Sequence, residues 1–284
     1  HQAVDAGRPF EQLQQAGMLT ARLEEIVRQK SPELKETVEQ LARGHVREAI
    51  DSLDRQGRVH EIADAGERMR AIATEYAAGP ERTLVISPDN RSREELNRLI
   101  HAELQQRGQV DEREYMAMVL TARQDMTGVD RQWAAQYEPG DVVRYSKGSQ
   151  AMGISAGEYA TVDGSHCASN LLTVDRGNGE RLAYDPRRLQ GVTVYRKSER
   201  SFSEGDRVQF TAPNKERHIA NRELATIESI DEHGNSQIKL DSGREVRLSL
   251  DEHPHLDYGY AVTSHSSQGA TADRVLINVD CEQA

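Results

Sequence analysis

A polar stretch near the end of the chain carries the residue types best suited to holding a ligand. Residues 264–269 read Ser-His-Ser-Ser-Gln-Gly and lie between two runs of apolar and β-branched residues, 260–263 and 275–277. This order predicts a strand, a functional turn, a short helix and a second strand. Open α/β sheets bind ligands on the carboxyl side of their strands, and Gly269 would let the backbone approach a ligand closely. A plain polar turn fits the same spacing.

The residues of several catalytic sites are missing from the sequence. The pattern G-x-x-x-x-G-K-[ST] does not occur and no acidic pair follows an apolar strand, so the chain is not expected to hydrolyse ATP by itself. His265 and Ser266 suggest a hydrolase pair, but no nucleophile elbow accompanies them. The two cysteines, Cys167 and Cys281, lack metal-type spacing and fit a reducing cytoplasm.

The composition is that of a folded, charge-rich protein with room for two domains. Of the 284 residues, 36% are hydrophobic and 29% are charged, and the formal net charge is −11. A negative total does not exclude nucleic acid as a partner, because local basic patches and backbone amides bind it. No apolar run is long enough for a membrane span, and the first residues show neither Met nor a signal-peptide pattern. We therefore expect a piece of a larger cytoplasmic protein that does not insert into membranes.

Alternating helix and strand signals predict an α/β layer in the first part of the chain. Residues 83–87 are apolar on both faces, as in a strand inside a parallel sheet, and Ser31 with Pro32 forms a helix-start signal. This pattern predicts a RecA-like or Rossmann-like layer. The expected helices are 9–17, 20–30, 32–44, 46–57, 67–76, 91–107 and 128–135, and the expected strands are 59–62, 83–87 and 116–120.

An internal repeat occupies the next part of the chain, where Gly140 matches Gly205 at an offset of 65 residues. Short alternating strands separated by glycine turns predict tandem SH3-like barrels of about 55 to 65 residues each. Units of this size are only marginally stable alone, so we expect the α/β domain to support them. The aligned segments are 137–145 with 202–210, 158–162 with 223–227 and, after a one-residue insertion, 172–175 with 238–241.

Together these segments resemble a known family. The sequence YAVTSHSSQGAT, at 260–271, resembles motif V of superfamily 1 DNA helicases of the RecD-like branch. Within that branch the whole chain resembles the C-terminal half of the helicase domain of conjugative relaxase-helicases, the MobF family of the TraI and TrwC group. The other matching segments are 1–7 with the tail of motif III, 23–29 with motif IV, 84–88 and 96–97 with the second RecA-like domain, and 221–227 with its inserted barrel, where Arg222 replaces a common glycine.

The resemblance implies a second RecA-like helicase domain, of the P-loop NTPase type, with tandem SH3-like barrels inserted in it. In this arrangement the strand at 260–263 pairs near 84–87. The implied boundaries are 1–124 for the first part of the RecA-like domain, 125–200 for the first barrel, 201–257 for the second barrel and 258–284 for the return to the RecA-like domain with motif V.

The resemblance also implies that the larger protein uses ATP and Mg²⁺ to move along single-stranded DNA with 5′-to-3′ polarity during plasmid transfer. Arg28 would stabilise charge that develops during phosphoryl transfer, and an ordinary ion pair with Glu24 or Glu25 is the alternative. The implied catalytic residues are Arg28 and Gln268; the nucleotide-binding residues are Arg28, Gln29, Gln268 and Gly269; and the DNA-binding residues are Asn221, Arg222, Thr263, His265, Ser266, Ser267 and Gln268.

The implied partners are single-stranded DNA, the first RecA-like domain and the relaxase domain of the same protein, and a type IV secretion coupling protein. The protein would act in the bacterial cytoplasm, with transfer to the recipient cell through a secretion channel as a further option. Two alternatives stay open. The barrels would form a translocation-signal module that docks the coupling protein, or the chain would be a degenerate helicase domain that binds DNA without turnover.

Overall fold

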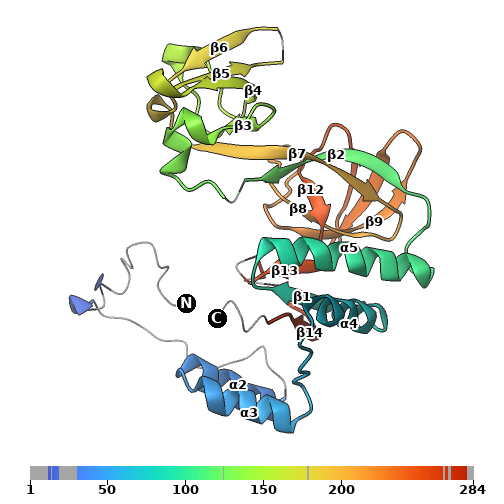
Figure 1. Cartoon of the computed structure of the whole chain (residues 1–284). Coiled ribbons are helices and arrows are strands. Elements are labelled where there is room, and N and C mark those ends of the chain that lie inside the picture. Colours follow the sequence, from blue (N-terminus) through green and yellow to red (C-terminus); the bar gives the residue numbers. More distant parts are fainter. Residues whose placement is uncertain are drawn as a thin grey trace. The chain divides into compact units, whose positions relative to one another are not determined.

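The computed structural model describes residues 12–13, 15–18 and 31–279, apart from positions 124, 178, 265, 268 and 269 (Figure 1). Contacts divide the chain into two units, His1–Ile62 and Ala63–Ala284, each with its own set of internal contacts. The segments that resemble motifs III and IV lie outside the described residues, so their conformation stays a prediction.

Two helices make up most of the described part of the first unit. Helix α2 (Pro32–Ala42) begins where the Ser31 hydroxyl accepts a hydrogen bond from the backbone of the first turn, with Pro32 as the first helical residue. Helix α3 (Val46–Arg55) packs against α2 and ends just before Gly57, which has a φ of 66°. Both predicted helices are confirmed. The strand predicted at 59–62 is wrong, because those residues pair with no strand of the described chain.

A three-stranded parallel sheet lies at the centre of the second unit. Its order is β13-β1-β14, with β1 spanning Thr83–Ser87, β13 spanning Ala261–Thr263 and β14 spanning Arg274–Ile277. Val85 of β1 lies opposite Ala261 on one side and Leu276 on the other. The predicted pairing of the strand at 260–263 with β1 is therefore confirmed.

Two helices share a core with this sheet, α4 (Ala65–Ala77) and α5 (Asn90–Gln106). The carboxylates of Asp64 and Asp89 cap them by accepting hydrogen bonds from first-turn amides. Asn97 of α5 is buried and fixes the start of β13, because its Oδ1 accepts from the Ala261 amide at 2.7 Å and its Nδ2 donates to the Ala261 carbonyl at 3.2 Å. Both predicted helices are confirmed.

The internal repeat is confirmed as two antiparallel arrays with the same strand order. The first array has the order β7-β3-β4-β5-β6, and the second has the order β12-β8-β9-β10-β11. The strands are β3 (Val142–Tyr145), β4 (Tyr159–His166), β5 (Leu171–Asp175), β6 (Arg181–Tyr184), β7 (Val192–Phe202), β8 (Arg207–Phe210), β9 (Leu224–Ile230), β10 (Asn235–Leu240), β11 (Glu245–Ser249) and β12 (Leu256–Tyr258). We call the two arrays the first and the second repeat.

The match between the repeats extends to single residues. Gly140 and Gly205 have φ values of 93° and 94°, and each donates at 2.8 Å to a carbonyl at the matching place in its own repeat. The next residue is in each case a buried aspartate, Asp141 or Asp206. The isolated bridges also recur at the same offset, Ser149 with Ile154 and Asn214 with Ile219.

Closed SH3-like barrels are not confirmed, because strand pairing among the described residues leaves both sheets open. Strand β2 (Tyr115–Ala122) joins the first sheet as an edge strand and pairs with β7 in an antiparallel ribbon. The other end of β7 pairs with β3, so β7 runs across the predicted boundary at residue 200. The domain boundaries remain predictions.

Two predicted helices are wrong. Between β13 and β14, the described residues 264, 266–267 and 270–273 form turns, a bend and irregular backbone rather than a short helix. In the segment 128–135 two 3-10 turns, η1 (Asp130–Gln132) and η2 (Ala134–Gln136), replace the expected helix. Trp133 separates them, because its extended backbone (φ −113°, ψ 119°) interrupts helical hydrogen bonding.

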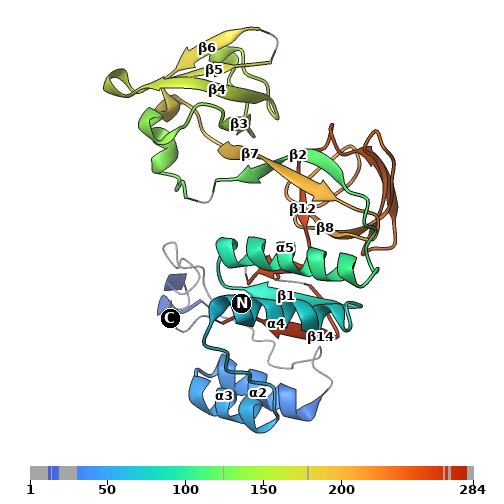
Figure 2. The same ribbon diagram turned by 45° about the vertical axis from the view of Figure 1, so that its right-hand side comes forward.

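The two repeats differ in how they are supported. Val208, Ile227 and Ile238 of the second repeat belong to the same hydrophobic core as Val85 and Ile100 of the α/β layer. Figures 1 and 2 show α5 between the parallel sheet and this repeat. The first repeat instead has a core of its own. The expected support by the α/β domain therefore applies directly to the second repeat.

Candidate nucleic-acid interface

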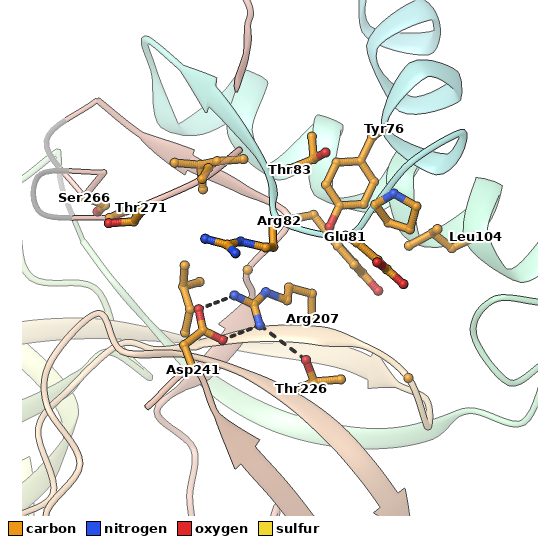
Figure 3. Close-up of a pocket in the computed structure, with 18 of the residues that line it drawn as sticks. Tyr76, Glu81, Arg82, Thr83, Leu104, Arg207, Thr226, Asp241, Ser266 and Thr271 are labelled. Carbon is orange, nitrogen blue, oxygen red and sulfur yellow. Dashed lines mark hydrogen bonds and ion pairs between the residues drawn. The ribbon is translucent and has the colours of Figure 1, made fainter. Parts of the chain in front are cut away.

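A cavity of about 1090 Å³ lies between the α/β layer and the second repeat (Figure 3). Ser266 and Thr271, from the segment after β13, are on one side, and Arg207, Thr226 and Asp241 of the second repeat lie on another. Its remaining charged lining residues are Glu81, Arg82 and Arg222. The lining thus carries three guanidinium groups and two carboxylates, so its charged groups sum to a positive charge although the whole chain has a net charge of −11. We call this space the interface cavity.

On the side of the cavity formed by the second repeat, Arg207 and Asp241 form an ion pair. The guanidinium of Arg207 donates to both carboxylate oxygens of Asp241, one of them at 2.5 Å, and to the Thr226 hydroxyl at 3.3 Å. Arg207 occupies the first position of β8, where the first repeat has Val142 at the same offset. A planar guanidinium fixed by a bidentate carboxylate keeps a constant orientation, and its remaining N–H groups can donate to another acceptor.

The segment after β13 presents several hydroxyl groups close together. The Thr263 hydroxyl accepts a hydrogen bond from the Ser266 amide at 3.3 Å, and the two hydroxyl oxygens are 3.2 Å apart. The Ser267 amide donates to the Thr263 carbonyl at 2.9 Å, and its hydroxyl donates to the Ser264 carbonyl at 2.8 Å. These bonds build a turn at the carboxyl end of a parallel strand, which is where open α/β sheets bind ligands.

Two cavity residues have a backbone conformation that side chains normally disfavour. Non-glycine residues with positive φ among the described residues are Arg82, Asn170, His218 and Arg222, and Arg82 and Arg222 line the interface cavity. The left-handed conformation costs about 1–2 kcal/mol for a residue with a Cβ. Such strain clusters at functional sites.

Arg222 has the same left-handed backbone as a glycine of the first repeat. Arg222 has a φ of 68°, and the matching residue of the first repeat is Gly157, with a φ of 88°. Both amides donate to the carbonyl of the matching aromatic residue, at 2.8 Å for Arg222 and 2.6 Å for Gly157. The backbone is therefore shared, and the second repeat carries an arginine where the first has the residue best suited to the conformation.

Two tyrosines, Tyr76 and Tyr260, also line the interface cavity. Tyr76 of α4 and Tyr260, which precedes β13, pack edge to face with ring centroids 5.7 Å apart. Burial raises the pKa of Tyr76 to about 12 and also raises that of Tyr260 well above its ordinary value. Both phenols therefore remain neutral around pH 7. Tyr260 donates a short hydrogen bond to Asp206 of the second repeat.

Comparison with known proteins gives consistent relatives. A family model described as an AAA domain matches residues 1–64. The multifunctional conjugation protein TraI of Escherichia coli is 24% identical over 320 residues, covering 95% of this chain, and TraI of Escherichia coli strain K12 is 25% identical over 323 residues, also covering 95% of it. The similarity to TraI extends over nearly the whole of this chain. The chain spans 17% of the length of these relatives.

Pif1 helicases are among the solved structures with a likeness to this chain. A structure of two coordinating Pif1 helicases at forked double-stranded DNA is 14% identical, with a TM-score of 0.40, and the match covers 89% of this chain and 42% of that one. Pif1 helicase from Bacteroides in complex with ADP-AlF3 and single-stranded DNA is 14% identical, with a TM-score of 0.30, covering 92% of this chain and 46% of that one.

The structure brings some of the predicted site residues together. Asn221, Arg222 and Ser266 line the interface cavity although they come from two distant segments. Thr263 and Ser267 belong to the adjoining turn and are not cavity-lining residues. The predicted residues that lie outside the described part are Arg28, Gln29, His265, Gln268 and Gly269.

Arg82, Arg207 and Thr271 are among the cavity residues that were not identified from the sequence. A signal for Arg207 was present, since the repeat alignment pairs this arginine with an apolar residue of the first repeat. Thr271 ends the stretch that resembles motif V. Among the residues described here, no cluster of His, Cys, Asp or Glu could hold a metal ion, and no helix is both long and apolar enough to cross a membrane.

Proposed function

We propose that this chain is the strand-gripping part of an ATP-driven helicase that moves along single-stranded DNA. The observation that carries the proposal is the interface cavity, which combines Ser266 with Asn221 and Arg222. Hydroxyl, amide and guanidinium groups hold phosphates without reading base sequence, as translocation requires. The likeness to a segment of the conjugation protein TraI supports the same function.

The proposal places the DNA backbone between the turn after β13 and the second repeat. The turn offers the hydroxyls of Thr263 and Ser266, and the facing wall offers Arg207 and Arg222. A phosphate between these groups would meet donors from both sides, and any relative motion of the two walls would change its contacts. ATP and Mg²⁺ enter through the resemblance alone, with Arg28, Gln29, Gln268 and Gly269 as the nucleotide-contacting residues and Arg28 and Gln268 as the catalytic ones.

The experiment that tests the proposal replaces Arg222 with glycine and measures binding of a fluorescently labelled oligothymidylate by anisotropy. We expect affinity to fall about threefold to tenfold, as for the loss of one charged contact. The slope of log affinity against log salt should shrink by about 0.7, the value for one phosphate of a single strand. The free energy of unfolding should stay the same or rise by up to about 1 kcal/mol, because glycine accepts a φ of 68°.

A matched control is His218→Gly. His218 also has a positive φ, 51°, and aligns with Gly153 of the first repeat, but it does not line the interface cavity. This change relieves the same kind of strain without removing a cavity cation, so DNA affinity should not change. Equal affinity of the Arg222→Gly variant and the unaltered chain would contradict the proposed grip.

The conjugative role, the 5′-to-3′ polarity and the other partners belong to the same proposal. The proposed partners are the first RecA-like domain, the relaxase domain and a type IV secretion coupling protein. The proposed location is the bacterial cytoplasm, with onward transfer to a recipient cell. A degenerate domain that binds DNA without turnover would show the same grip. Measuring DNA-stimulated ATPase activity of the longer protein separates these two possibilities.

A second candidate function concerns the first repeat, which would dock the secretion coupling protein. The observation that favours it is the separate hydrophobic core of this repeat, typical of an accessory module. Residues 123–194 can be replaced by an Asn-Gly turn, because the pairs from Ala122 with Tyr195 to Tyr115 with Phe202 would remain as a hairpin. In the longer protein we expect plasmid transfer to be lost while unwinding persists. Normal transfer would reject the docking role.

A further inference from the structure

Trp133 is exposed in a way that the interface cavity does not explain. It is the only tryptophan of the chain, and its side chain is 48% exposed. It lies between η1 and η2, in the segment that leads into the first repeat, and it does not line the interface cavity. A large ring left half in water is a candidate contact surface.

The backbone on both sides of this ring is fixed by one buried side chain. Asn170 accepts a hydrogen bond from the Ala134 amide at 2.7 Å and donates to the Gln132 carbonyl at 3.0 Å. Its own backbone is left-handed, with a φ of 53°, and only 8% of the residue is exposed. Asn170 thus spans the two neighbours of Trp133, and the indole is presented from a rigid support.

The same asparagine orients a cation that lies over the ring. Asn170 Nδ2 donates to Asp185 Oδ1 at 2.9 Å, and Asp185 holds Arg187 through Nη2–Oδ2 and Nε–Oδ1 bonds of 2.6 and 3.0 Å. The guanidinium carbon of Arg187 lies 5.9 Å from the centroid of the indole. The hydrogen bonds from Arg187 hold the pKa of Asp185 at about 2, so this carboxylate stays charged around pH 7.

We propose that Trp133 and Arg187 form a platform on which a nucleobase of single-stranded DNA stacks, at a site separate from the interface cavity. This inference rests on the proposed function. A flat indole with an adjacent guanidinium matches the aromatic and cationic surfaces that bind single strands without sequence preference. Arg131 lies in η1, and Arg188 follows Arg187 in another 3-10 turn, η5 (Pro186–Arg188).

Local charge favours a polyanion over an acidic or neutral protein surface. Residues 129–133 and 185–188, which carry the platform, contain Arg131, Arg187 and Arg188 against Asp130 and Asp185. Asp185 is already engaged by Arg187 and Asn170. A strand held in the interface cavity by its backbone would gain a second contact here through a base, which would lengthen the bound segment.

The test uses the fluorescence of the single tryptophan. Stacking of a base on the indole should quench the emission of the 284-residue chain when oligothymidylate is added. An oligonucleotide of the same length with abasic sites should bind with little quenching, because it offers phosphates without rings. In anisotropy measurements Trp133→Ala should weaken oligothymidylate binding about fivefold, the lower end for one stacked base. Trp133→Phe should recover part of this loss.

Val129→Ala is the matched control. Val129 is 65% exposed and lies next to the same turn, but it has no ring, so its removal should leave affinity unchanged. Two results would overturn the platform without affecting the proposed grip in the interface cavity: DNA binding that leaves the tryptophan fluorescence unaltered, or a Trp133→Ala variant that binds DNA as tightly as the unaltered chain. Either result would leave Trp133 as an anchor for a protein partner. Absence of any DNA binding in the anisotropy assay would overturn both proposals.

Discussion

Replacing Asp206 with alanine is expected to lower the free energy of unfolding by about 3–5 kcal/mol, the cost of removing one partner from a buried ion pair. Asp206 is 0% exposed and joins three elements. Its Oδ1 lies 2.7 Å from His101 Nδ1 of α5 and accepts a short bond from Tyr260, and its Oδ2 accepts from the Ser203 amide at 2.6 Å. Urea denaturation measures the loss.

The pH dependence of the same network gives a second readout. Burial acts to lower the pKa of His101, but the hydrogen bond and charge of Asp206, helped by Glu114, outweigh it and leave the pKa raised. The interaction therefore stabilises the fold fully below the unfolded pKa of about 6.5 and is lost as the pH rises through the folded pKa. In Asp206→Asn this part of the pH profile should flatten.

The control for Asp206 is its equivalent in the first repeat, Asp141. Asp141 pairs with Arg123 at 2.7 Å and accepts from the Glu138 amide at 2.9 Å, so Asp141→Ala should also destabilise its surroundings. Arg123 and Glu138, the partners of Asp141, do not line the interface cavity. We therefore expect DNA affinity to fall for the Asp206 variants and to be kept by Asp141→Ala under conditions where both remain folded. Equal effects on affinity would contradict a positioning role for Asp206.

Replacing His255 with glutamine is expected to remove an acid sensitivity of about 2 kcal/mol between pH 7 and pH 4.5. His255 precedes β12 of the second repeat, and its ring packs against Tyr159 and Tyr195 of the first repeat, with centroids 5.6 and 5.1 Å away. Its Nε2 lies 2.6 Å from the Tyr159 hydroxyl. The contact therefore joins the two repeats.

The loss of stability at low pH follows from the lowered pKa of His255. Burial, and then the positive charges of Arg144 and His253, lower the pKa of His255 to about 4. A depressed histidine pKa means that the folded state prefers the neutral ring. Its contribution is present above the unfolded pKa of about 6.5 and is lost as the pH falls toward 4. Urea denaturation at a series of pH values tests this, and parallel profiles for the variant and the unaltered chain would contradict it.

Much of the fold could be predicted because it depends on local patterns. The Ser31-Pro32 signal and the apolar run at 83–87 are read from neighbouring residues, and α2 and β1 follow them. The offset of 65 residues was visible in the sequence and recurs in strand order and bridges. At 128–135 the same kind of reading was wrong, because the side chain of Asn170, distant in sequence, fastens the backbone on both sides of Trp133.

The candidate site was predicted only in part. Ser266 and Arg222 were identified through the resemblance, and the structure places both on one cavity. Arg82 could not be found in this way, since its role depends on a left-handed backbone next to β1 and on the approach of the second repeat. Closure of the repeats into barrels was an expectation from their short alternating strands and glycine turns, and strand pairing among the described residues does not confirm it.

By itself, the sequence determined the repeated unit, because strand patterns and glycine positions act over short distances. The pairing partner of the strand at 260–263 was implied by the family resemblance, which rests on matching segments along the whole chain. Only the tertiary structure decided that equivalent aspartates have different partners. Asp141 pairs with Arg123, while Asp206 joins α5 to Tyr260. The physical reason is that a buried carboxylate takes whichever donor the packing brings to it, and packing depends on residues far apart in the chain.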